Sequence, residues 1–331
     1  MIYGFAFLVA FALVFALIPA LTKLAARLDF TDKPTERKRH SVPIPFAGGV
    51  AMFIAFSVGF IIFVVFMSPP AYAQAGDLLG ATGIAAVLGG TTLIVGIGLL
   101  DDFAKTRGKE FPVWPRIAVH IGAAALAFAA GIRFTGFFNP FTDSYVELHI
   151  AIQFALTMLW FVGLVTVFNF MDGLDGLSGL LALLSGCTLF VVAMTMSQSD
   201  SAFMAALFVG AVVGFLRYNL PPAKVFMGDA GAYMLGYLLA AISLHGAFKQ
   251  ATVISVFIPI LAMGVPIFDS VLVVARRLIA RKPAHMADSS DITHIHYRLL
   301  KKGMKPAHAV AVIFLLSACL NLTSIIIMLL I

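Results

Sequence analysis

The sequence has very few charged residues for its length. Asp, Glu, Lys and Arg make up 11% of its 331 residues, whereas they make up about 25% of a typical soluble domain. A water-soluble fold with 61% hydrophobic residues would expose more apolar surface than can stay dispersed. A disordered chain is excluded as well, because disorder requires few aromatic residues and many charges, and 31 residues here are Phe.

Cysteines and nucleotide-binding loops are equally scarce. The two cysteines, Cys187 and Cys319, lie inside apolar runs, which argues against a disulfide framework or a thiolate metal cluster and predicts that both pack as small apolar residues. No G-x-x-x-x-G-K-[ST] segment occurs, so the chain is not a P-loop ATPase or GTPase. The glycine-containing run at 85–98 lies within an apolar stretch and lacks the strand–helix context of a dinucleotide fingerprint.

Long apolar stretches dominate the rest of the sequence. Each is about 20 residues long, enough to cross roughly 30 Å of hydrocarbon as a helix, and the alternation expected of a membrane β-barrel is absent. The ten stretches are 2–22, 46–67, 80–100, 116–134, 150–168, 177–196, 202–217, 230–248, 252–275 and 307–330. The sequence therefore predicts an all-α, polytopic membrane bundle of about ten helices, with residues 1–331 as one domain.

The basic residues are distributed asymmetrically between the two sets of loops that ten spans define. With Arg116 assigned to its second loop, one set holds 20 of the 22 Lys and Arg residues, and the other keeps Arg133 and Lys249. Basic loops face the cytoplasm, so we expect both termini outside. The +6 net charge then belongs to one face and indicates anionic membrane lipids and phosphorylated ligands, with no nucleic acid. The basic set is 23–45, 101–115, 169–176, 217–229 and 276–306.

Acidic residues and two histidines gather at the same predicted face. A charge next to hydrocarbon is costly and is usually functional. Taken singly, each acid also fits a helix boundary, an N-cap or a tight turn, and exposed histidines are common in loops. Their convergence from separate loops is what predicts a site. These residues are Asp101, Asp102, Asp172, Asp175, Asp229, His294 and His296. Hard oxygen ligands without thiolates indicate Mg²⁺ or Mn²⁺, and nearby Lys and Arg suit a metal-bridged diphosphate.

Six ordered motifs give the chain a resemblance to a known family. They are DKPTERKRHSVPIPFAGGV (32–50), LLDDFAK (99–105), NFMDGLDGLSG (169–179), YNLPPAKVFMGDAG (218–231), PIFD (266–269) and DITHIHYRLL (291–300). Together they resemble the polyprenyl-phosphate N-acetylhexosamine-1-phosphate transferases of glycosyltransferase family 4. The segment at 35–49 and the HIH motif are most similar to the branch that uses UDP-N-acetylglucosamine and undecaprenyl phosphate. That branch typically reads HIHH, whereas Tyr297 stands here, so other UDP-N-acetylated sugars stay open.

The resemblance implies a role for each matching residue. Catalytic roles fall to Asp101, Asp102, Asp172, Asp175, His294 and His296. Substrate binding falls to Lys105, Asn169, Asn219, His40 and Arg281, with Arg276 and Arg277 as looser matches. Metal binding falls to Asp229, with Asp102 and Asp175 in support. Asp101 is the candidate base for the lipid phosphate, and Lys105 is the candidate cation for a phosphate.

The family also implies a reaction and its partners. Polyprenyl phosphate attacks the β-phosphorus of the UDP-sugar, UMP leaves, and a lipid-linked pyrophosphoryl sugar forms that initiates cell-envelope glycan synthesis in the bacterial cytoplasmic membrane. The resemblance leaves the oligomeric state open and is compatible with a homodimer. An Asp can act as base or as nucleophile, so direct transfer, which we favour, and an aspartyl-phosphate both stay open. A secondary transporter is the main rival, but transporter sites lie near the bilayer midplane, whereas these acids lie at span ends.

Overall fold

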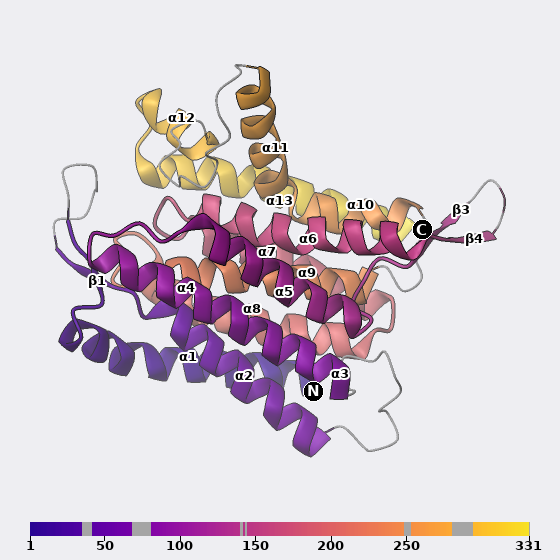
Figure 1. Ribbon diagram of the computed structural model, residues 1–331, viewed down its shortest axis with the longest axis horizontal. Coiled ribbons are helices and arrows are strands. Elements are labelled where there is room, and N and C mark those ends of the chain that lie inside the picture. The colour runs from indigo at the N-terminus through magenta and orange to yellow at the C-terminus, as the bar shows by residue number, and fades with distance from the viewer. Residues whose placement is uncertain are drawn as a thin grey trace.

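The apolar runs fold into helices because only a helix or a closed barrel satisfies every backbone N–H and C=O group inside a membrane. The computed structural model describes residues 1–34, 42–67, 81–139, 142, 144–247, 253–279 and 294–330. Most of its helices run side by side along the long axis of the molecule (Figure 1). The all-α fold class is therefore confirmed.

The described residues form helices and two short strand pairs. The longer helices are α1 (Ile2–Arg27), α2 (Gly48–Met67), α4 (Gly90–Thr106), α5 (Val113–Ala129), α6 (Ile150–Met171), α7 (Leu177–Thr195), α8 (Ser199–Asn219), α9 (Gly228–Ala247) and α13 (Pro306–Leu330). The shorter ones are α3 (Ala81–Ile84), a π-helical turn η2 (Ala85–Gly89), α10 (Val253–Ala262), α11 (Gly264–Ile279) and α12 (Ile295–Lys301). Strands β1 (Thr31–Asp32) and β2 (Ile44–Pro45) pair antiparallel, as do β3 (Gly136–Asn139) and β4 (Ser144–Glu147).

Seven helices in the described ranges are long and apolar enough to cross a membrane. They make the chain a multi-pass membrane protein. One of them is the continuous helical run Thr82–Thr106, which ends with α4. The other six are α1, α2, α6, α7, α8 and α13. The count of ten spans stays a prediction.

The predicted span 252–275 is wrong as a single helix. The helical run is interrupted at Met263, between α10 and α11. Four residues after Ala262 stands Pro266, which has no N–H to continue the helical hydrogen bonds. In Figure 1, α11 stands almost upright while the long helices lie horizontally, so the chain changes direction here.

The cysteine prediction is also wrong. Cys187 on α7 and Cys319 on α13 both lie on exposed faces of their helices. In a membrane bundle an apolar residue is as acceptable towards lipid as towards the protein interior, so an apolar context does not distinguish the two positions.

Helices α8 and α9 form the centre of the bundle. Within the stretch of each helix that is apolar enough to span a membrane, 78% of the residues are buried in α8 but only 22% in α1. Helix α9 packs against α2, α4, α6 and α7, and α8 packs against α1 and α7. The ends of α9 are therefore held on several sides, which makes its N-terminus a rigid place for a site.

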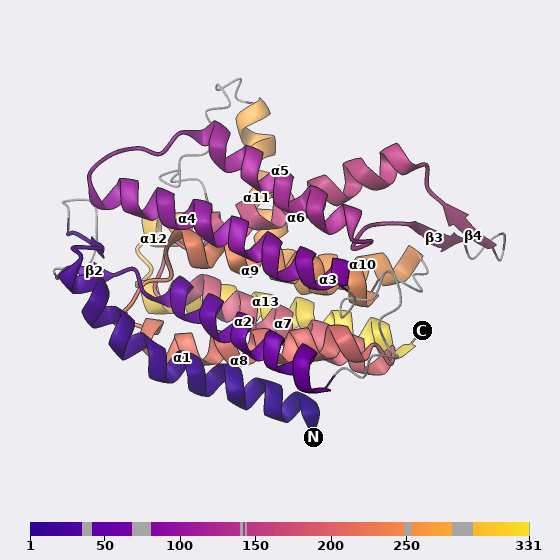
Figure 2. The same ribbon diagram turned by 60° about the horizontal axis from the view of Figure 1, so that its bottom comes forward.

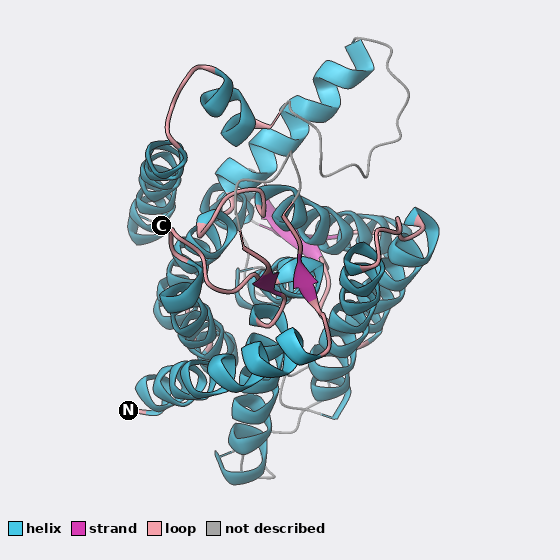
Figure 3. Ribbon diagram, turned by 90° about the vertical axis from the view of Figure 1, so that its left-hand side faces the viewer, coloured by secondary structure: helices cyan, strands magenta, loops and turns pink. Residues whose placement is uncertain are grey.

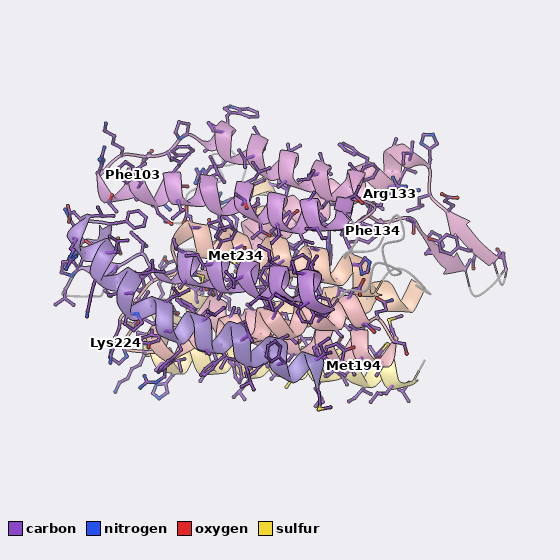
Figure 4. The ribbon with its side chains drawn as sticks, turned by 90° about the horizontal axis from the view of Figure 1, so that it is seen from below. Phe103, Arg133, Phe134, Met194, Lys224 and Met234 are labelled. Atoms are coloured by element: carbon purple, nitrogen blue, oxygen red, sulfur yellow. The ribbon has the colours of Figure 1, made fainter. Side chains whose placement is uncertain are left out.

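The two ends of the bundle differ in what they carry. Lys224 and Phe103 lie at one end, and Arg133, Phe134 and Met194 lie at the other (Figure 4). Both chain termini lie towards the second end, where β3 and β4 project (Figures 1 and 2). The first end, seen face-on in Figure 3, carries β1, β2 and α12, and the predicted site loops meet there.

Backbone contacts join the segment before α2 to the start of α9. Phe226 N donates to Pro45 O over 3.0 Å, Gly48 N donates to Phe226 O over 3.0 Å, and Gly49 N donates to Met227 O over 3.1 Å. These bonds hold the loop before α9 against β2, so the first residues of α9 have little freedom to move.

Gly98 of α4 lies directly against the first turn of α9. A Cβ there would clash with Ala230 Cα and lie 2.5 Å from Ala230 N, whereas a Cβ at Gly96 would meet nothing within 4 Å. We therefore expect Gly98→Ala to destabilise the protein by about 1–3 kcal/mol through overpacking and to lower turnover by displacing the start of α9.

The matched control is Gly96→Ala on the same helix, which should be neutral or stabilising by up to about 1 kcal/mol. Thermal unfolding in detergent and turnover measure both variants. Equal effects of the two substitutions would contradict the close approach of α4 and α9.

Candidate active site

The carboxylate of Asp102 caps the N-terminus of α9. Its Oδ1 accepts a hydrogen bond from Asp229 N at 2.8 Å and its Oδ2 accepts one from Ala230 N at 3.2 Å. The first N–H groups of a helix have no partner inside the helix and attract a negative charge. Gly228, with φ at +68°, makes the turn that brings these N–H groups to Asp102. Asp102 thereby fixes where Asp229 lies.

Asp229 collects several hydrogen bonds from neighbouring helices. Its Oδ2 lies 2.6 Å from Lys105 Nζ and accepts from Tyr233 Oη at 3.2 Å. Its Oδ1 accepts from Asn169 Nδ2 at 3.1 Å. Lys105 comes from α4, Asn169 from α6 and Tyr233 from the next turn of α9. Two predicted site residues, Lys105 and Asn169, therefore converge on the carboxylate of a third, Asp229, together with Tyr233.

Asp101 lies next to the same lysine but has a different main partner. Its Oδ2 forms a 2.8 Å ion pair with Arg116 Nη1. Its Oδ1 lies 3.8 Å from Lys105 Nζ, and Tyr233 Oη donates to its Oδ2 over 3.4 Å. Lys105 and Tyr233 therefore bridge Asp101 and Asp229, and two cations, Lys105 and Arg116, balance the charges of the carboxylate cluster.

The α6–α7 loop brings Asp172 and Asp175 to the site with separate partners. Asp172 Oδ1 accepts from Ser178 Oγ at 2.8 Å, and Asp175 Oδ2 accepts from Ala223 N at 3.0 Å. Burial raises the pKa of Asp172 to about 7, although the Ser178 hydrogen bond opposes the shift. Asp172 therefore changes charge near neutral pH.

Asn219 connects the loop after α6 with the loop after α8. Its Oδ1 accepts from Gly176 N at 2.9 Å, and its Nδ2 donates to Val225 O at 2.9 Å. Its side chain reaches the site, but both of its polar atoms already bond to backbone.

The two motif histidines have different surroundings. His294 Nδ1 lies 2.7 Å from Asp269 Oδ2, and Asp269 Oδ1 accepts from Ile295 N at 2.8 Å. His296 is fully buried, packs against Gly173, and has no partner for either ring nitrogen within the part of the chain that the structure describes. Burial, followed by the nearby His294, lowers the pKa of His296 to about 4. His296 is therefore neutral at pH 7 and has hydrogen-bonding capacity for a ligand.

Most of the predicted residues meet at one cavity of about 650 Å³. Its lining contains both polar and apolar side chains. The polar ones include Asp102, Lys105, Asn169, Asp172, Asp175, Asn219 and Asp229. The apolar ones include Val42, Ile44, Phe46, Leu174, Phe226 and Val310, and Tyr297 also lines the cavity. Such a mixed lining can accept both a charged group and hydrocarbon.

Some predicted residues do not line this cavity. Asp101 is buried behind Lys105, and the histidine pair lies beside the cavity around Gly173. His40 and Arg281 lie outside the described residues. Arg276 and Arg277 are on the last turn of α11, outside the cavity lining.

Arg116 and Tyr233 have positions that the sequence analysis missed. Arg116 was treated only as a loop charge, although it pairs with Asp101. Tyr233 stands four residues after Asp229, and that spacing on one helix places the two side chains on the same face. The i, i+4 spacing was the available signal for Tyr233.

The donor set suits a hard cation. Asp101 and Asp229 offer carboxylate oxygens on either side of the Lys105 ammonium, and Asn169 offers an amide oxygen. Within the described ranges, no group of three His, Cys, Asp or Glu residues could hold a metal ion. Mg²⁺ commonly binds one or two carboxylates and keeps water and substrate phosphates as its other ligands, so the residues fit an ion of this kind.

A multi-pass helical bundle with a carboxylate- and lysine-lined cavity at one end defines a membrane-embedded enzyme that handles phosphorylated substrates. The sequence profile of glycosyl transferase family 4 matches residues 84–247. The chain belongs to this family and is a phosphotransferase, as its similar relatives are.

Individual relatives cover nearly the whole chain. A probable undecaprenyl-phosphate N-acetylglucosaminyl 1-phosphate transferase of Bacillus subtilis is 31% identical over 97% of this chain and 84% of its own. A decaprenyl-phosphate N-acetylglucosaminephosphotransferase of Mycobacterium tuberculosis is 31% identical over 88% of this chain and 74% of its own. A phospho-N-acetylmuramoyl-pentapeptide-transferase of Symbiobacterium thermophilum is 29% identical over 83% of each chain.

We expect Arg116→Gln to destabilise the folded protein by about 3 kcal/mol, because it leaves the buried Asp101 carboxylate without its main charge partner, and to lower turnover because the charge balance of the carboxylate cluster changes. Only 1% of the Asp101 side chain and 14% of the Arg116 side chain are exposed. UMP release by the purified variant measures the effect.

Arg107→Gln is the control, since Arg107 stacks on Phe103 just after α4 and has no place in the carboxylate cluster. It should change turnover by no more than about twofold. Similar losses in both variants would mean that the general basicity of this loop, and not the Asp101 pair, supports activity.

Proposed function

We propose that the protein transfers N-acetylglucosamine 1-phosphate from UDP-N-acetylglucosamine to undecaprenyl phosphate and releases UMP. The observation that carries this proposal is the cavity, whose lining combines acids and a lysine with apolar side chains. The charged residues suit a nucleotide diphosphate with a bound cation, and the apolar residues suit a polyprenyl chain. The activities for which the Bacillus subtilis and Mycobacterium tuberculosis relatives are named support the same reaction.

The product of this reaction is a polyprenyl pyrophosphoryl sugar, which we propose initiates cell-envelope glycan synthesis. We place the cavity on the cytoplasmic face of the bacterial inner membrane, because the loops at that end carry most of the basic residues. Both termini then face outward.

The two reacting groups are anions, so the site has to offset their repulsion. Lys105, whose side chain is 40% exposed, reaches the cavity from the Asp101–Asp229 cluster and can turn towards a phosphate. Mg²⁺, bound by Asp229 and one further carboxylate, would supply additional positive charge to the diphosphate.

Asp101 and Asp102, the two neighbouring acids of α4, have different roles in this proposal. Asp102 has both oxygens committed to backbone N–H groups of α9. Neither oxygen of Asp101 is held by backbone: Oδ2 pairs with Arg116, and Oδ1 lies 3.8 Å from Lys105 Nζ. We therefore assign Asp101 to accept the proton of the lipid phosphate. Because Asp101 is 1% exposed and lies behind Lys105, Lys105 has to turn towards the phosphate first, and the lipid oxygen then attacks the β-phosphorus directly.

The same chemistry on UDP-N-acetylmuramoyl-pentapeptide is the second candidate. It is favoured by the similarity to the Symbiobacterium thermophilum enzyme and by Tyr297, which lines the cavity and stands where the N-acetylglucosamine branch has the last histidine of its HIHH motif. A larger phenolic ring at this position would alter the contacts available to the sugar.

The decisive assay presents undecaprenyl phosphate and a panel of UDP-sugars to inverted and right-side-out vesicles and measures UMP release. We expect release with UDP-N-acetylglucosamine in inverted vesicles only, because the charged nucleotide does not cross the bilayer. Release with the muramoyl-pentapeptide substrate alone would support the second candidate. Release only in right-side-out vesicles would reverse the proposed orientation.

Turnover should also require a divalent cation that Asp229 binds. Excess EDTA should stop UMP release, and Asp229→Asn should lower it by at least about 100- to 1000-fold at saturating Mg²⁺, as expected for the loss of a charge interaction worth about 3–4 kcal/mol.

Asp200→Asn provides the matched control, because Asp200 and Asp229 both occupy the first turn of a helix. Asp200 is not among the residues that line the cavity, and its substitution should leave turnover nearly unchanged. If both variants kept similar activity, the metal-binding role of Asp229 would be wrong.

A further inference from the structure

The break between α10 and α11 leaves one backbone carbonyl without its helical donor. In a helix the C=O of Ala262 would accept from the N–H of residue 266, but residue 266 is proline. A buried carbonyl without a partner is costly, and more so where no water reaches it. The chain therefore needs a donor from another helix at this point.

Two other helices supply such donors. Ser185 Oγ of α7 donates to Ala262 O over 2.8 Å, and Asn321 Nδ2 of α13 donates to the same oxygen over 3.0 Å. Asn321 is itself held, because its Oδ1 accepts from Thr188 Oγ1 at 2.6 Å. Ser185 is 1% exposed and Asn321 is 4% exposed. Hydrogen bonds to Ala262 O thus tie the bend between α10 and α11 to α7 and α13.

The direction of α11 decides where the histidine motif lies. Asp269 is seven residues after Ala262, about 10 Å along a helix. Both of its oxygens are used at the start of α12, one by His294 Nδ1 and the other by Ile295 N. Figure 3 shows α11 leaving the bundle on the same side as α12. A change in the angle of α11 would therefore move His294 and His296 relative to the cavity.

We infer that Ser185 and Asn321 are positioning residues for the transfer reaction. They set the angle between α10 and α11, and through Asp269 they hold the histidine motif beside the cavity. Neither residue is among those that line the cavity, so both act through another part of the protein. The inference rests on the proposed function for its activity readout, and wild-type UMP release establishes that function independently of the variants.

The test uses Ser185→Ala and Asn321→Leu in the full-length protein, with Ser185→Thr as the conservative variant that keeps the hydroxyl donor. Each variant removes one of the two donors to the buried Ala262 carbonyl, and we expect kcat to fall by about tenfold because the angle of α11 then holds the histidine motif less precisely. The KM for the UDP-sugar should stay nearly unchanged, because the polar lining of the cavity includes residues of α4, α6 and α9. Ser185→Thr should keep near wild-type kcat.

A distance measurement reports the bend directly. Spin labels at Leu278 on α11 and Leu159 on α6, both exposed, are introduced after Cys187 and Cys319 are replaced by serine. Pulsed dipolar spectroscopy should show a shifted or broader distance distribution in Ser185→Ala and in Asn321→Leu. Ser185→Ala removes a single hydroxyl, so it keeps the test valid if Asn321→Leu does not fold.

Ser324→Ala is the matched control. Ser324 is fully buried on α13, and its Oγ donates to Ile258 O over 2.9 Å. That carbonyl lies four residues before Ala262, whose N–H remains available as its helical donor. The control should leave kcat and the distance distribution unchanged. The inference is overturned if Ser185→Ala leaves the distance and kcat unchanged, if Ser324→Ala matches its effect, or if KM and kcat deteriorate together.

Discussion

The contact between Asp102 and the first N–H groups of α9 is the interaction on which the site depends. It ties the end of α4 to the start of α9, and the close approach at Gly98 leaves no space for another arrangement. Once α9 begins there, Asp229 reaches Lys105 and Asn169, and Tyr233 follows one turn later. Asp102, which the sequence suggests as a catalytic residue beside Asp101, therefore also holds the start of α9 in place.

Charge balance explains how so many acids can share one end of a membrane bundle. Lys105 lies between Asp101 and Asp229, and Arg116 holds the far side of Asp101. Breaking such a buried pair leaves an uncompensated charge, which is more costly than the pair itself is stabilising. If a second cation binds Asp101 and Asp229, Lys105 becomes available to bind a phosphate.

The histidine motif reaches the cavity by a separate route. Asp269 on α11 orients His294, and the fully buried His296 follows on the same short helix. The direction of α11 comes from the break at Pro266 and from polar side chains of α7 and α13 deep in the bundle. The site thus joins a rigid part, built on α4, α6 and α9, to an arm whose angle is set elsewhere.

Composition and order along the chain were enough to predict a helical membrane protein, the family and the acids that meet at one cavity, because apolar length, charge scarcity and motif order are properties of the sequence itself. Sequence alone could not separate the roles of Asp101 and Asp102, since two adjacent carboxylates differ only in the partners that folding brings to them. Arg116 and Tyr233 were missed for the same reason. The span 252–275 was predicted as one helix because its hydropathy is continuous, but the missing N–H of Pro266 breaks it, and only the tertiary structure shows which side chains take the freed carbonyl.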